Sequence, residues 1–465
     1  APWYAMRGML EKLASALTRF MQRMMPDPFV VAILLTLIAF GAALVHVSFD
    51  VPQVLVAWYD GTGKAKGFWN LLAFGMQMCL ILVTGHALAS SPPLRKALDA
   101  LAGRARTPQS AIVIVACGAM VSGLVNWGLG LIAGALLARE VGRRCKARAV
   151  PVHYPLLAAA GYTGMLVWHG GLSGSAPLKV TLSSDLAQLL EAPTAEAIGA
   201  IPLGQTIGAT PNLVVNAAFL LIVPWLLVRM LPADPAARIP APSFDGDAPA
   251  KSDEKAPNTP AERLGRSRIL AWLTCLAGIA TWILIVREQG IGRLDPNLIN
   301  FLFLFLGLAL HGSLVAYGRA IGDAARGCAG IILQFPFYAG IMGVLAGTGL
   351  LQSIASAMAS TGATLLPAVS FYSAGLVNLF VPSGGGQWAV QGPVLMDAAL
   401  RTELSPARLV MALAYGDQWT NMLQPFWALP LLGITRVAAR DIIGYTAVLL
   451  LVAQIPFLIA LYVGW

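Results

Sequence analysis

The chain has 465 residues, of which 57% are hydrophobic and only 11% are charged. This composition excludes an ordinary soluble domain, in which about half of the residues are apolar and about a quarter are charged. The formal net charge is +9, but the Lys and Arg residues lie in short connectors beside apolar runs, where they set membrane orientation rather than bind nucleic acid. Five scattered cysteines without a CxxC pair predict neither a disulfide framework nor a metal site.

The N-terminal part predicts an amphipathic helix followed by two membrane spans. Residues 1–27 contain a basic amphipathic stretch typical of a helix along the inner membrane surface, so we expect a cytoplasmic N-terminus. The apolar run 28–45 is long enough to cross a bilayer core of about 30 Å, and 67–90 predicts the return. Basic residues between 95 and 106 then place this exit in the cytoplasm.

Residues 109–138 predict a re-entrant helical hairpin rather than a crossing. The segment carries no charge and would be about 45 Å long as a straight helix, which is too long for one upright span. Basic clusters flank both ends, so both ends are expected on the cytoplasmic side. The sequence Asn126-Trp127-Gly128-Leu129-Gly130 provides glycines for the turn between the two arms.

The next segment, 155–180, predicts a broken span. The run His169-Gly170-Gly171-Leu172-Ser173-Gly174-Ser175 interrupts it and is too rich in glycine for an undisturbed helix. An inward span then completes the first half of the chain, 28–230. Residues 231–268 are rich in Pro, Ala, Asp and Lys and lack an apolar period, which predicts a flexible cytoplasmic linker.

The second half is expected to repeat this order in the opposite direction. A connecting helix over 269–296 reverses the orientation, and a second repeat occupies 297–465. Within it, 365–396 predicts a second hairpin and 411–434 a second broken span. Charges beside the spans place the two halves in opposite orientations, with a periplasmic C-terminus. The sequence therefore predicts an all-α polytopic membrane protein built from two inverted-topology repeats.

Each hairpin carries the tetrapeptide GLVN close to its turn. It ends at Asn126 in the first hairpin and at Asn378 in the second, where Pro382-Ser383-Gly384-Gly385-Gly386 follows and cannot continue a helix. A break at membrane depth leaves backbone N–H and C=O groups without partners, unless protein buries them or they line a watery cavity. Two matched breaks in two halves are typical of the binding site of a transporter.

The hairpin turns and broken spans offer helix N-termini, which favour an anion through hydrogen bonds and the helix dipole. A small carboxylate is the predicted guest, and the glycines let it approach the backbone closely. The alternative is that these small residues only allow close helix packing. The predicted substrate-binding residues are Asn126, Gly128, Gly130, Ser173, Ser383, Gly384, Gly385, Gly386, Asn421 and Gln424.

Four polar residues are predicted to couple transport to a cation or proton. Asn126 and Asn378 present side-chain carbonyls that suit a hard monovalent cation such as Na⁺, with interhelical hydrogen bonding as the alternative. Asp417 is an acid inside an apolar span, where an ionisable group is costly and is by default a functional hypothesis. His169 is a candidate because histidine as a residue type changes charge near neutral pH, and a bond to a backbone carbonyl is its equally good alternative. Beyond this monovalent cation we expect no metal and no cofactor.

Tryptophans gather close to the predicted breaks. Trp127, Trp168, Trp388 and Trp419, together with Trp427, predict apolar walls around a short acyl tail, and interfacial anchoring is the usual alternative. At about 0.8 kcal/mol for each buried CH₂ group, such a tail contributes only about 2–3 kcal/mol. The carboxylate group must therefore supply much of the affinity.

Several long motifs resemble, nearly end to end, those of the bacterial short-chain fatty acid transporter family. They are GFWNLLAFGMQM from Gly67, TGHALASS from Thr84, NWGLG from Asn126, VPSGGGQW from Val381 and QPFWALP from Gln424. The resemblance implies a secondary carrier for short-chain monocarboxylates such as acetate, butyrate or acetoacetate. It also implies the paired re-entrant hairpins of the wider ion-transporter superfamily, an elevator-type transport domain and a homodimer. By position it places at the site Asn126, Gly128, Ser383 to Gly386 and Asn421.

These observations predict a cation-coupled symporter that moves short-chain carboxylates across the bacterial inner membrane, with Na⁺ or H⁺ as the coupling ion. The alternative is a passive channel, which would show no gradient-driven accumulation. A membrane-embedded enzyme is poorly supported, because the sequence shows no paired carboxylates, metal cluster or nucleophile with a placed base. The expected partners are the carboxylate, the lipid bilayer and a second copy of the chain, and no nucleic acid.

Overall fold

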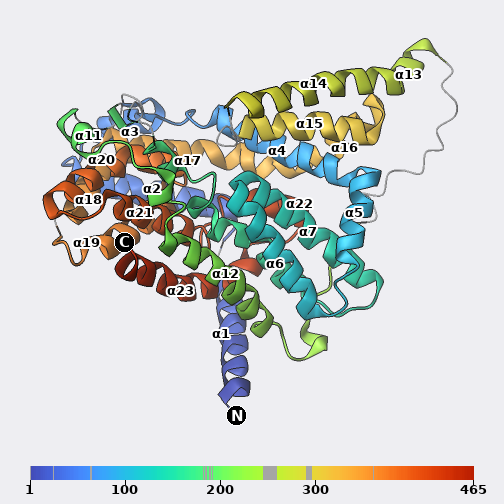
Figure 1. Cartoon of the computed structure of the whole chain (residues 1–465), viewed down its shortest axis with the longest axis horizontal. Helices are drawn as coiled ribbons and strands as arrows, with labels where there is room; N and C mark the ends of the chain where they lie inside the picture. The colour runs from blue at the N-terminus through green and yellow to red at the C-terminus, as the bar shows by residue number, and fades with distance from the viewer. Residues whose placement is uncertain are drawn as a thin grey trace.

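The protein folds almost entirely into α-helices (Figure 1). The computed structural model describes residues 2–24, 26–62, 65–181, 183, 186–187, 190, 192–244, 259–289, 296–359 and 361–465. The strands among these residues form one antiparallel two-residue hairpin, in which β1 (Gly61–Thr62) pairs with β2 (Ala65–Lys66). The prediction of a helical protein is therefore confirmed, with this short hairpin as an addition.

Many of the helices are long and apolar enough to cross a membrane. Among the described residues, six stretches meet that condition: Pro28–His46, Pro108–Val125, Thr210–Arg229, Pro260–Gln289, Leu314–Gly347 and Ala439–Val463. Shorter apolar helices cover Leu72–Leu88, Asn297–His311 and Leu366–Phe380. Large aliphatic side chains on the first stretch, such as Leu37 and Ile38, are exposed, as lipid contact requires. The chain is a multi-pass membrane protein.

The first half contains one helical hairpin and one interrupted segment. The leading helices are α1 (Pro2–Met24), α2 (Pro28–His46), α3 (Val51–Tyr59), α4 (Leu72–Ser90) and α5 (Pro92–Ala102). The hairpin is α6 (Pro108–Val125) with α7 (Trp127–Ala147). The interrupted segment consists of α8 (Tyr154–Tyr162), η1 (Thr163–Leu166), η2 (Trp168–Gly170) and α9 (Ser175–Lys179). After it come α11 (Ala192–Ile198), η3 (Leu203–Gln205), α12 (Thr210–Arg229) and η4 (Pro235–Ala237).

The second half has the same two features. It begins with α13 (Pro260–Gly265), α14 (Arg268–Gln289), α15 (Pro296–His311), α16 (Leu314–Ala325), η7 (Arg326–Cys328), α17 (Ala329–Gly347) and α18 (Leu350–Ala359). The hairpin is α19 (Leu366–Phe380) with α20 (Gly384–Thr402). The interrupted segment is α21 (Pro406–Thr420) with α22 (Leu429–Thr435), and α23 (Ala439–Val463) closes the chain.

Short polar residues set the ends of the hairpin helices. Thr107 and Ser110 cap the start of α6 reciprocally, because each side-chain oxygen accepts the backbone N–H of the other. Asn126 ends α6 and begins α7, and Ser383 begins α20. The second arms, α7 and α20, continue beyond the predicted limits of 138 and 396 into charged sequence. Basic residues near the last turn favour this extension through the helix dipole.

Glycines let the helices of the hairpins and the interrupted segments cross at very short distance. Gly134 of α7 and Gly161 of α8 touch through their backbones, and a Cβ atom on either would collide with the carbonyl oxygen of the other. Gly416 of α21 lies in the same way against the carbonyl oxygen of Phe371 in α19. Small residues at such crossings permit close backbone packing. The packing holds each hairpin beside the interrupted segment of its own half.

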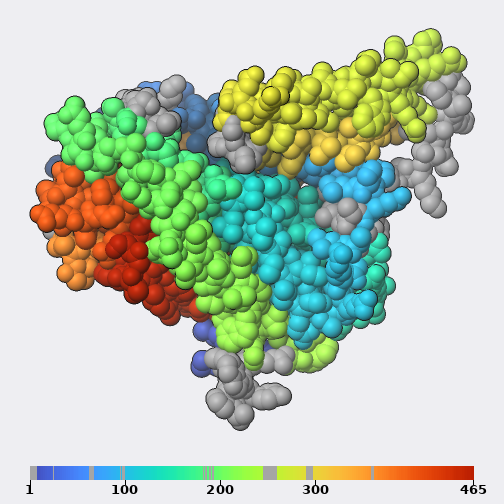
Figure 2. Space-filling view, in the orientation of Figure 1, coloured from blue at the N-terminus to red at the C-terminus, as the bar shows by residue number. Residues whose placement is uncertain are grey.

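The remaining helices form a layer and a flank around this interior. In Figure 1, α14, α15 and α16 lie together beside α4, and α1 projects from the opposite side of the molecule. α1 packs on α23, where Gly444 touches the backbone of Thr18. Figure 2 shows α12, in green, on the surface between α23, in red, and the cyan helices of the first hairpin. α12 therefore joins elements of both halves.

Part of the predicted linker packs on the protein. Residues 231–244, which we call the strap, run across the ends of α7, α8 and α22. The buried ring of Phe244 lies between the guanidinium groups of Arg139 and Arg436, which are 5.0 and 5.3 Å from its centroid. The backbone of Ile239 accepts a 2.8 Å hydrogen bond from Tyr154 N–H. The rest of the linker up to 258, and residues 290–295 of the predicted connecting helix, lie outside the described residues.

Candidate functional site

The turn of the first hairpin and the first interrupted segment are joined by hydrogen bonds. Leu172 N–H donates to the carbonyl oxygen of Leu124 at 2.7 Å, and Trp127 N–H donates to Ser173 Oγ at 2.9 Å. The predicted residues Ser173 and Trp127 are therefore neighbours, although 46 positions separate them. The structure brings the first turn and the first break together, as a site built from both requires.

The turn of the second hairpin lies against both interrupted segments. A Cβ atom placed on Gly384 would lie 2.7 Å from His169 Cε1, 2.8 Å from Asp417 Oδ2 and 3.0 Å from the Trp168 ring. His169 and Trp168 belong to η2 of the first interrupted segment, and Asp417 belongs to α21 of the second. Glycine is needed here because any side chain would occupy the space of these groups. Three of the four breaks in the chain thus meet at Gly384.

The backbone N–H groups at the first hairpin turn are already hydrogen-bonded within the protein. Asn126 alone forms the turn, and its side-chain oxygen accepts the N–H groups of Gly128 and Leu129 at 2.9 and 3.1 Å. The Trp127 N–H is bound to Ser173 Oγ, and the Gly130 N–H is bound to the Asn126 carbonyl oxygen. The first four N–H groups of α7 therefore all have acceptors. Gly130 is in backbone contact with Gly123 of the opposite arm. Asn126 and Gly130 therefore act as a helix cap and a packing residue in this conformation.

The second hairpin turn is open. Ser383 Oγ accepts the N–H of Gly386 at 3.3 Å, but the N–H groups of Gly384 and Gly385 find no acceptor among the described residues. Gly385 is exposed, and a Cβ atom added to it would meet nothing within 4 Å. The start of α20 therefore has two unpaired backbone donors and a positive dipole end, with Gly384 buried beside Asp417 and Gly385 exposed to open space.

His169 and Asp417 form a pair that is completely buried. The two side chains join the two interrupted segments, and both residues have 0% of their surface exposed. His169 Nδ1 lies 2.7 Å from Asp417 Oδ2, a contact too far off the N–H axis to be a regular hydrogen bond. Asp417 Oδ1 has no hydrogen-bond partner among the described residues. The predicted acid and the predicted histidine therefore meet, and the acid keeps an unsatisfied oxygen.

The other ring nitrogen of His169 determines its protonation. Nε2 accepts a 3.1 Å hydrogen bond from the backbone N–H of Ala176, so this nitrogen carries no hydrogen. A neutral imidazole then holds its one hydrogen on Nδ1, facing Asp417. The doubly protonated ring is incompatible with the Ala176 contact. With its hydrogen on Nδ1, His169 faces Asp417 Oδ2 at 2.7 Å without forming a regular hydrogen bond.

Several residues that hold the first break were not predicted. Gln418 Oε1 accepts the backbone N–H groups of His169 and Gly170 at 2.8 and 3.1 Å. Asn212 and Asn216 of α12 donate to the carbonyl oxygen of Gly170 at 2.8 and 3.2 Å. These amides replace the hydrogen bonds that the broken helix lacks. The polar run around Asp417 contains Gln418, and this run was the sequence signal that could have indicated its role. The two asparagines lie in an otherwise apolar helix, which gave no such signal.

A chain of buried amides connects the second hairpin with the second break. Asn378 Nδ2 donates to the Asp417 carbonyl oxygen at 2.8 Å and to Asn421 Oδ1 at 2.9 Å. Gln424 Nε2 donates to the same Asn421 oxygen at 2.7 Å. The oxygens Asn378 Oδ1 and Gln424 Oε1 have no partners among the described residues. No group of three or more His, Cys, Asp or Glu side chains within the described part of the chain is placed to hold a metal ion.

Aromatic rings line the region between the first turn and the second break. The Trp127 ring lies 6.5 Å from Trp168 and 5.0 Å from Trp427, centroid to centroid, and Phe74 lies 5.9 Å from Trp427. The indole N–H groups of Trp168 and Trp427 have no acceptor among the described residues. Phe335 and Phe426, 4.4 Å apart, extend the group and were not predicted as part of it.

Two of the predicted tail-pocket tryptophans lie elsewhere. Trp419 packs against Phe371 and Tyr372 and donates to the Leu450 carbonyl oxygen on α23 at 2.7 Å. Trp388 is buried in a separate apolar cluster of α20 and α21, with its ring against Gly392. Each of these two side chains points away from the aromatic rings around Trp127, because the direction of a side chain follows its position around the helix.

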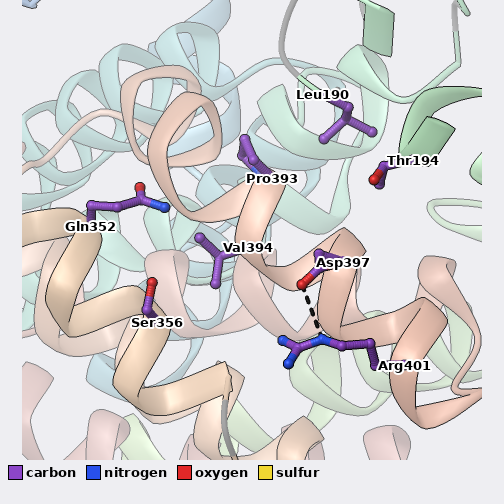
Figure 3. A pocket seen from close by; sticks show the side chains of 8 residues that line it. All are labelled: Leu190, Thr194, Gln352, Ser356, Pro393, Val394, Asp397 and Arg401. Atoms are coloured by element: carbon purple, nitrogen blue, oxygen red, sulfur yellow. Dashed lines mark ion pairs between the residues drawn. The ribbon is translucent and has the colours of Figure 1, made fainter. Parts of the chain in front are cut away.

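A hollow of about 460 Å³ opens beside the C-terminal half of α20 (Figure 3). Gln352 and Ser356 of α18 line it, together with Asp397 and Arg401, whose side chains form an exposed 3.0 Å ion pair. At a rise of about 1.5 Å per residue, Asp397 lies about 20 Å along the helix from Ser383. The hollow therefore lies outside the predicted site, whose residues do not line it.

Comparison with known proteins identifies relatives along almost the whole chain. The profile of the family described as "Short chain fatty acid transporter" matches residues 9–463. A relative from Escherichia coli (strain K12), provisionally named as a short-chain fatty acid transporter, is 40% identical over 461 residues, 97% of this chain and 99% of its own length. A relative of the same name from Haemophilus influenzae (strain ATCC 51907 / DSM 11121 / KW20 / Rd) is 37% identical over 462 residues, 98% of this chain and 100% of its own length.

Two solved structures align over nearly the whole chain at low similarity. The antimetabolite efflux pump MtrF of Neisseria gonorrhoeae is 18% identical, with a TM-score of 0.40, and covers 95% of this chain and 97% of its own. The transporter YdaH of Alcanivorax borkumensis is also 18% identical, with a TM-score of 0.41, and covers 94% and 97%. The family match and the two curated relatives support one conclusion: this chain is a transporter and not an enzyme, and it belongs to the short-chain fatty acid transporter family.

Proposed function

We propose that the protein is a cation-coupled symporter for short-chain carboxylates such as acetate, butyrate or acetoacetate. The observation that carries the proposal is the open start of α20, where Gly384 and Gly385 present unpaired N–H groups beside the buried Asp417. A carboxylate needs such donors, and a helix N-terminus also favours its charge. The first hairpin turn has no free donors, so the substrate binds at the second turn.

The surroundings of the two glycines suit a short acyl tail. Trp168 lies 3.0 Å from the Cβ position of Gly384, and Met342 lies 3.5 Å from that of the following Gly386. The carboxylate accepts from the glycine N–H groups and Ser383 supports the turn. The indole N–H of Trp168 is a further donor, for a substrate oxygen. Binding thus uses the Ser383, Gly384, Gly385 and Gly386 of the prediction.

A second negative charge close to Asp417 explains the need for a cation. Asp417 lies next to Gly384, so an anionic substrate at α20 meets a buried carboxylate of the same sign. Like charges in a buried site repel strongly unless one is neutralised. One Na⁺ or H⁺ bound with each carboxylate removes this repulsion. Binding of ion and substrate then becomes mutually dependent, which is the requirement for symport.

The arrangement of hairpins and interrupted segments supports alternating access. We propose that the two halves are inverted-topology repeats and that both hairpins enter the membrane without crossing it. The hairpins and interrupted segments then move together as an elevator-type domain, in a homodimer of the inner membrane with a cytoplasmic N-terminus and a periplasmic C-terminus. The close glycine crossings between α7 and α8 and between α19 and α21 favour a rigid body of this kind.

Uptake of radiolabelled butyrate into proteoliposomes tests the proposal, with Na⁺ and H⁺ gradients imposed separately and protein-free liposomes subtracted. A symporter accumulates butyrate above equilibrium under one of the gradients, whereas a channel only equilibrates it. Ser383→Ala and Asn378→Ala are expected to reduce uptake severalfold in folded protein. Asp397→Asn, on the same helix at the separate hollow, is the control and is expected to behave as the unmodified protein. Unaltered uptake in both site variants would refute the site.

A further inference from the structure

We infer that the coupling ion is a proton and that Asp417 carries it, with His169 as a positioning residue that stays neutral. This inference rests on the proposed function, because it concerns the ion that accompanies the carboxylate. Three features of the buried pair support a proton on Asp417: the fixed tautomer of the histidine, the kind of atom that contacts the carboxylate, and the place of the carboxylate beside the substrate donors.

The fixed tautomer excludes His169 as the proton carrier. Its Nε2 accepts the N–H of Ala176 at 3.1 Å, so a second proton has no place on the ring while this contact holds. Its Nδ1 carries the only hydrogen and faces Asp417 Oδ2 at 2.7 Å. Asp417 is then the one group of the pair that can gain a proton without breaking a contact. Its free Oδ1 supplies the lone pair.

The polar side-chain contact that the structure gives the Asp417 carboxylate is to a ring nitrogen of His169 and not to an oxygen that could bind a cation. Oδ2 faces the Nδ1–H of His169, and the neighbouring amide of Asn378 directs its N–H group to the Asp417 carbonyl and to Asn421 Oδ1. A sodium ion needs several oxygens that converge on it, as hard cations generally do. A proton needs one lone pair only. Asn378 Oδ1 and Gln424 Oε1 are unpartnered oxygens, which makes a Na⁺ comparison part of the test.

Other charged groups do not take over this role. Among the described titratable residues on the elements packed against α21, His169 is the one whose side chain the structure places in contact with the Asp417 carboxylate. The tyrosines Tyr162 and Tyr415 donate their hydroxyl groups to the Asn421 carbonyl and to Asn212 Oδ1. The remaining groups on these elements and on α21 itself face elsewhere or are exposed: Tyr372, Asp397, Arg401, Lys179, Arg408, Arg440, Asp441, Tyr445 and Tyr462.

The position of Asp417 links its proton to the substrate. Oδ2 lies 2.8 Å from the Cβ position of Gly384, so the carboxylate already faces the donor end of α20 that the substrate needs. Ionised Asp417 competes with the substrate for that dipole and repels it. Protonation of Oδ1 converts the acid to a neutral group and leaves the helix N-terminus to the substrate. One proton then enters with each carboxylate, and the transported pair is electrically neutral.

Isothermal titration calorimetry of the purified full-length protein with butyrate tests this inference without the leak of butyric acid through liposomes. Titrations in buffers of different ionisation enthalpy count the protons taken up. The expected result is one proton for each butyrate bound, and a Kd that rises about tenfold per pH unit once the free protein has lost that proton. Replacement of Na⁺ by choline is expected to leave the Kd unchanged.

Two carboxylate-to-amide variants form a matched pair for the same assay. Asp417→Asn removes the titratable oxygen at nearly constant shape, and its butyrate Kd is expected to be independent of pH with no proton uptake. Asp397→Asn changes an exposed acid on α20 and is expected to keep the one-proton linkage. His169→Gln is expected to retain one proton with a shifted pH range, because the histidine only positions the acid. The proton count on the unmodified protein stands even if Asp417→Asn does not fold.

The outcomes separate this inference from the proposed function. Butyrate binding without proton uptake, a Kd that depends on Na⁺, or unchanged proton uptake in folded Asp417→Asn would overturn the inference and leave the carboxylate transporter proposal intact. Absence of butyrate binding to the unmodified protein at every pH would overturn both. One proton per butyrate that is lost only in Asp417→Asn would establish the carrier.

Discussion

The first two glycines of α20 have identical chemistry and different surroundings. Gly384 is buried against His169, Asp417 and Trp168, at distances that leave no room for a methyl group. Gly385 is exposed and has empty space where its Cβ atom would lie. Packing within the protein therefore requires glycine at position 384. At the second position the protein has room for a side chain, so the space is free for a ligand.

This difference predicts opposite results for two alanine variants. Gly384→Ala pushes a methyl group into the His169 and Asp417 side chains, which is expected to cost about 1–3 kcal/mol of folding stability and to weaken butyrate binding at least tenfold. Gly385→Ala is expected to keep the stability of the unmodified protein. Thermal unfolding in detergent and calorimetric titration measure the two quantities. Equal melting temperatures for the two variants would contradict the geometry at Gly384.

At the scale of single elements, the two hairpin turns use their helix N-termini differently. α7 has every orphan N–H group bound, through the side chain of Asn126, its carbonyl oxygen and Ser173. α20 has only the N–H of Gly386 bound to a side chain, that of Ser383. The turn Val381-Pro382-Ser383 is longer than the single residue Asn126, and none of its oxygens accepts the N–H of Gly384 or Gly385 within the described part of the chain. We therefore expect the first turn to stabilise the fold, and we propose the second as the place of binding.

Asn126 is accordingly expected to contribute to stability more than to binding. Asn126→Ala removes the cap of Gly128 and Leu129, which typically costs about 1 kcal/mol, and more when the donors are left buried. Asn126→Ser is expected to restore most of the loss, because serine is also a good N-cap. Melting temperatures in detergent report the stability, and butyrate titration reports the affinity. A large loss of affinity in folded Asn126→Ala, with unchanged stability, would show that the first turn binds the substrate directly.

At the scale of the whole molecule, the strap joins the two halves outside the predicted spans. Phe244 lies between Arg139 of the first half and Arg436 of the second. His153, just before α8, accepts the Ile239 N–H at 3.0 Å through Nδ1 and contacts the Tyr445 hydroxyl at 2.9 Å through Nε2. Both ring nitrogens of His153 therefore have a polar partner, and the neutral ring can accept the hydrogen bond from the strap. Burial, and after it the nearby charge of Arg238, lowers the pKa of His153 from 6.5 to about 4.

This lowered pKa predicts an acid-sensitive strap. Between pH 6.5 and about 4 the unfolded chain binds a proton at His153 that the folded protein excludes. Stability therefore falls as the pH drops through this range, by about 3 kcal/mol in total. His153→Asn keeps an acceptor for Ile239 but does not titrate, so its melting temperature is expected to fall less between about pH 7 and about pH 5. An identical fall in both proteins would contradict a role for His153.

Most helices could be predicted from the sequence because apolar runs, glycines and prolines act locally. The interrupted segments and hairpins follow from Gly-rich stretches within uncharged sequence, and their limits differ mainly where charged ends remain helical, as in α7. Pairings between distant segments could not be predicted in this way. Gln418 holds the backbone of His169 across 249 positions, and no local pattern records such a contact. The direction of Trp388 and Trp419 likewise depends on which neighbours surround their helices.

The sequence by itself determined that this protein spans a membrane, that its helices break near Asn126, His169, Ser383 and Asp417, and that it belongs with transporters of small carboxylates. Composition and local backbone preference suffice for the first two conclusions, whereas the third rests on the resemblance of its motifs to those of the family. Only the tertiary structure decided which helix N-terminus is already bound and which is open, and that His169 faces Asp417. The reason is physical: whether a polar atom is free depends on the atoms packed against it, and those come from distant parts of the chain.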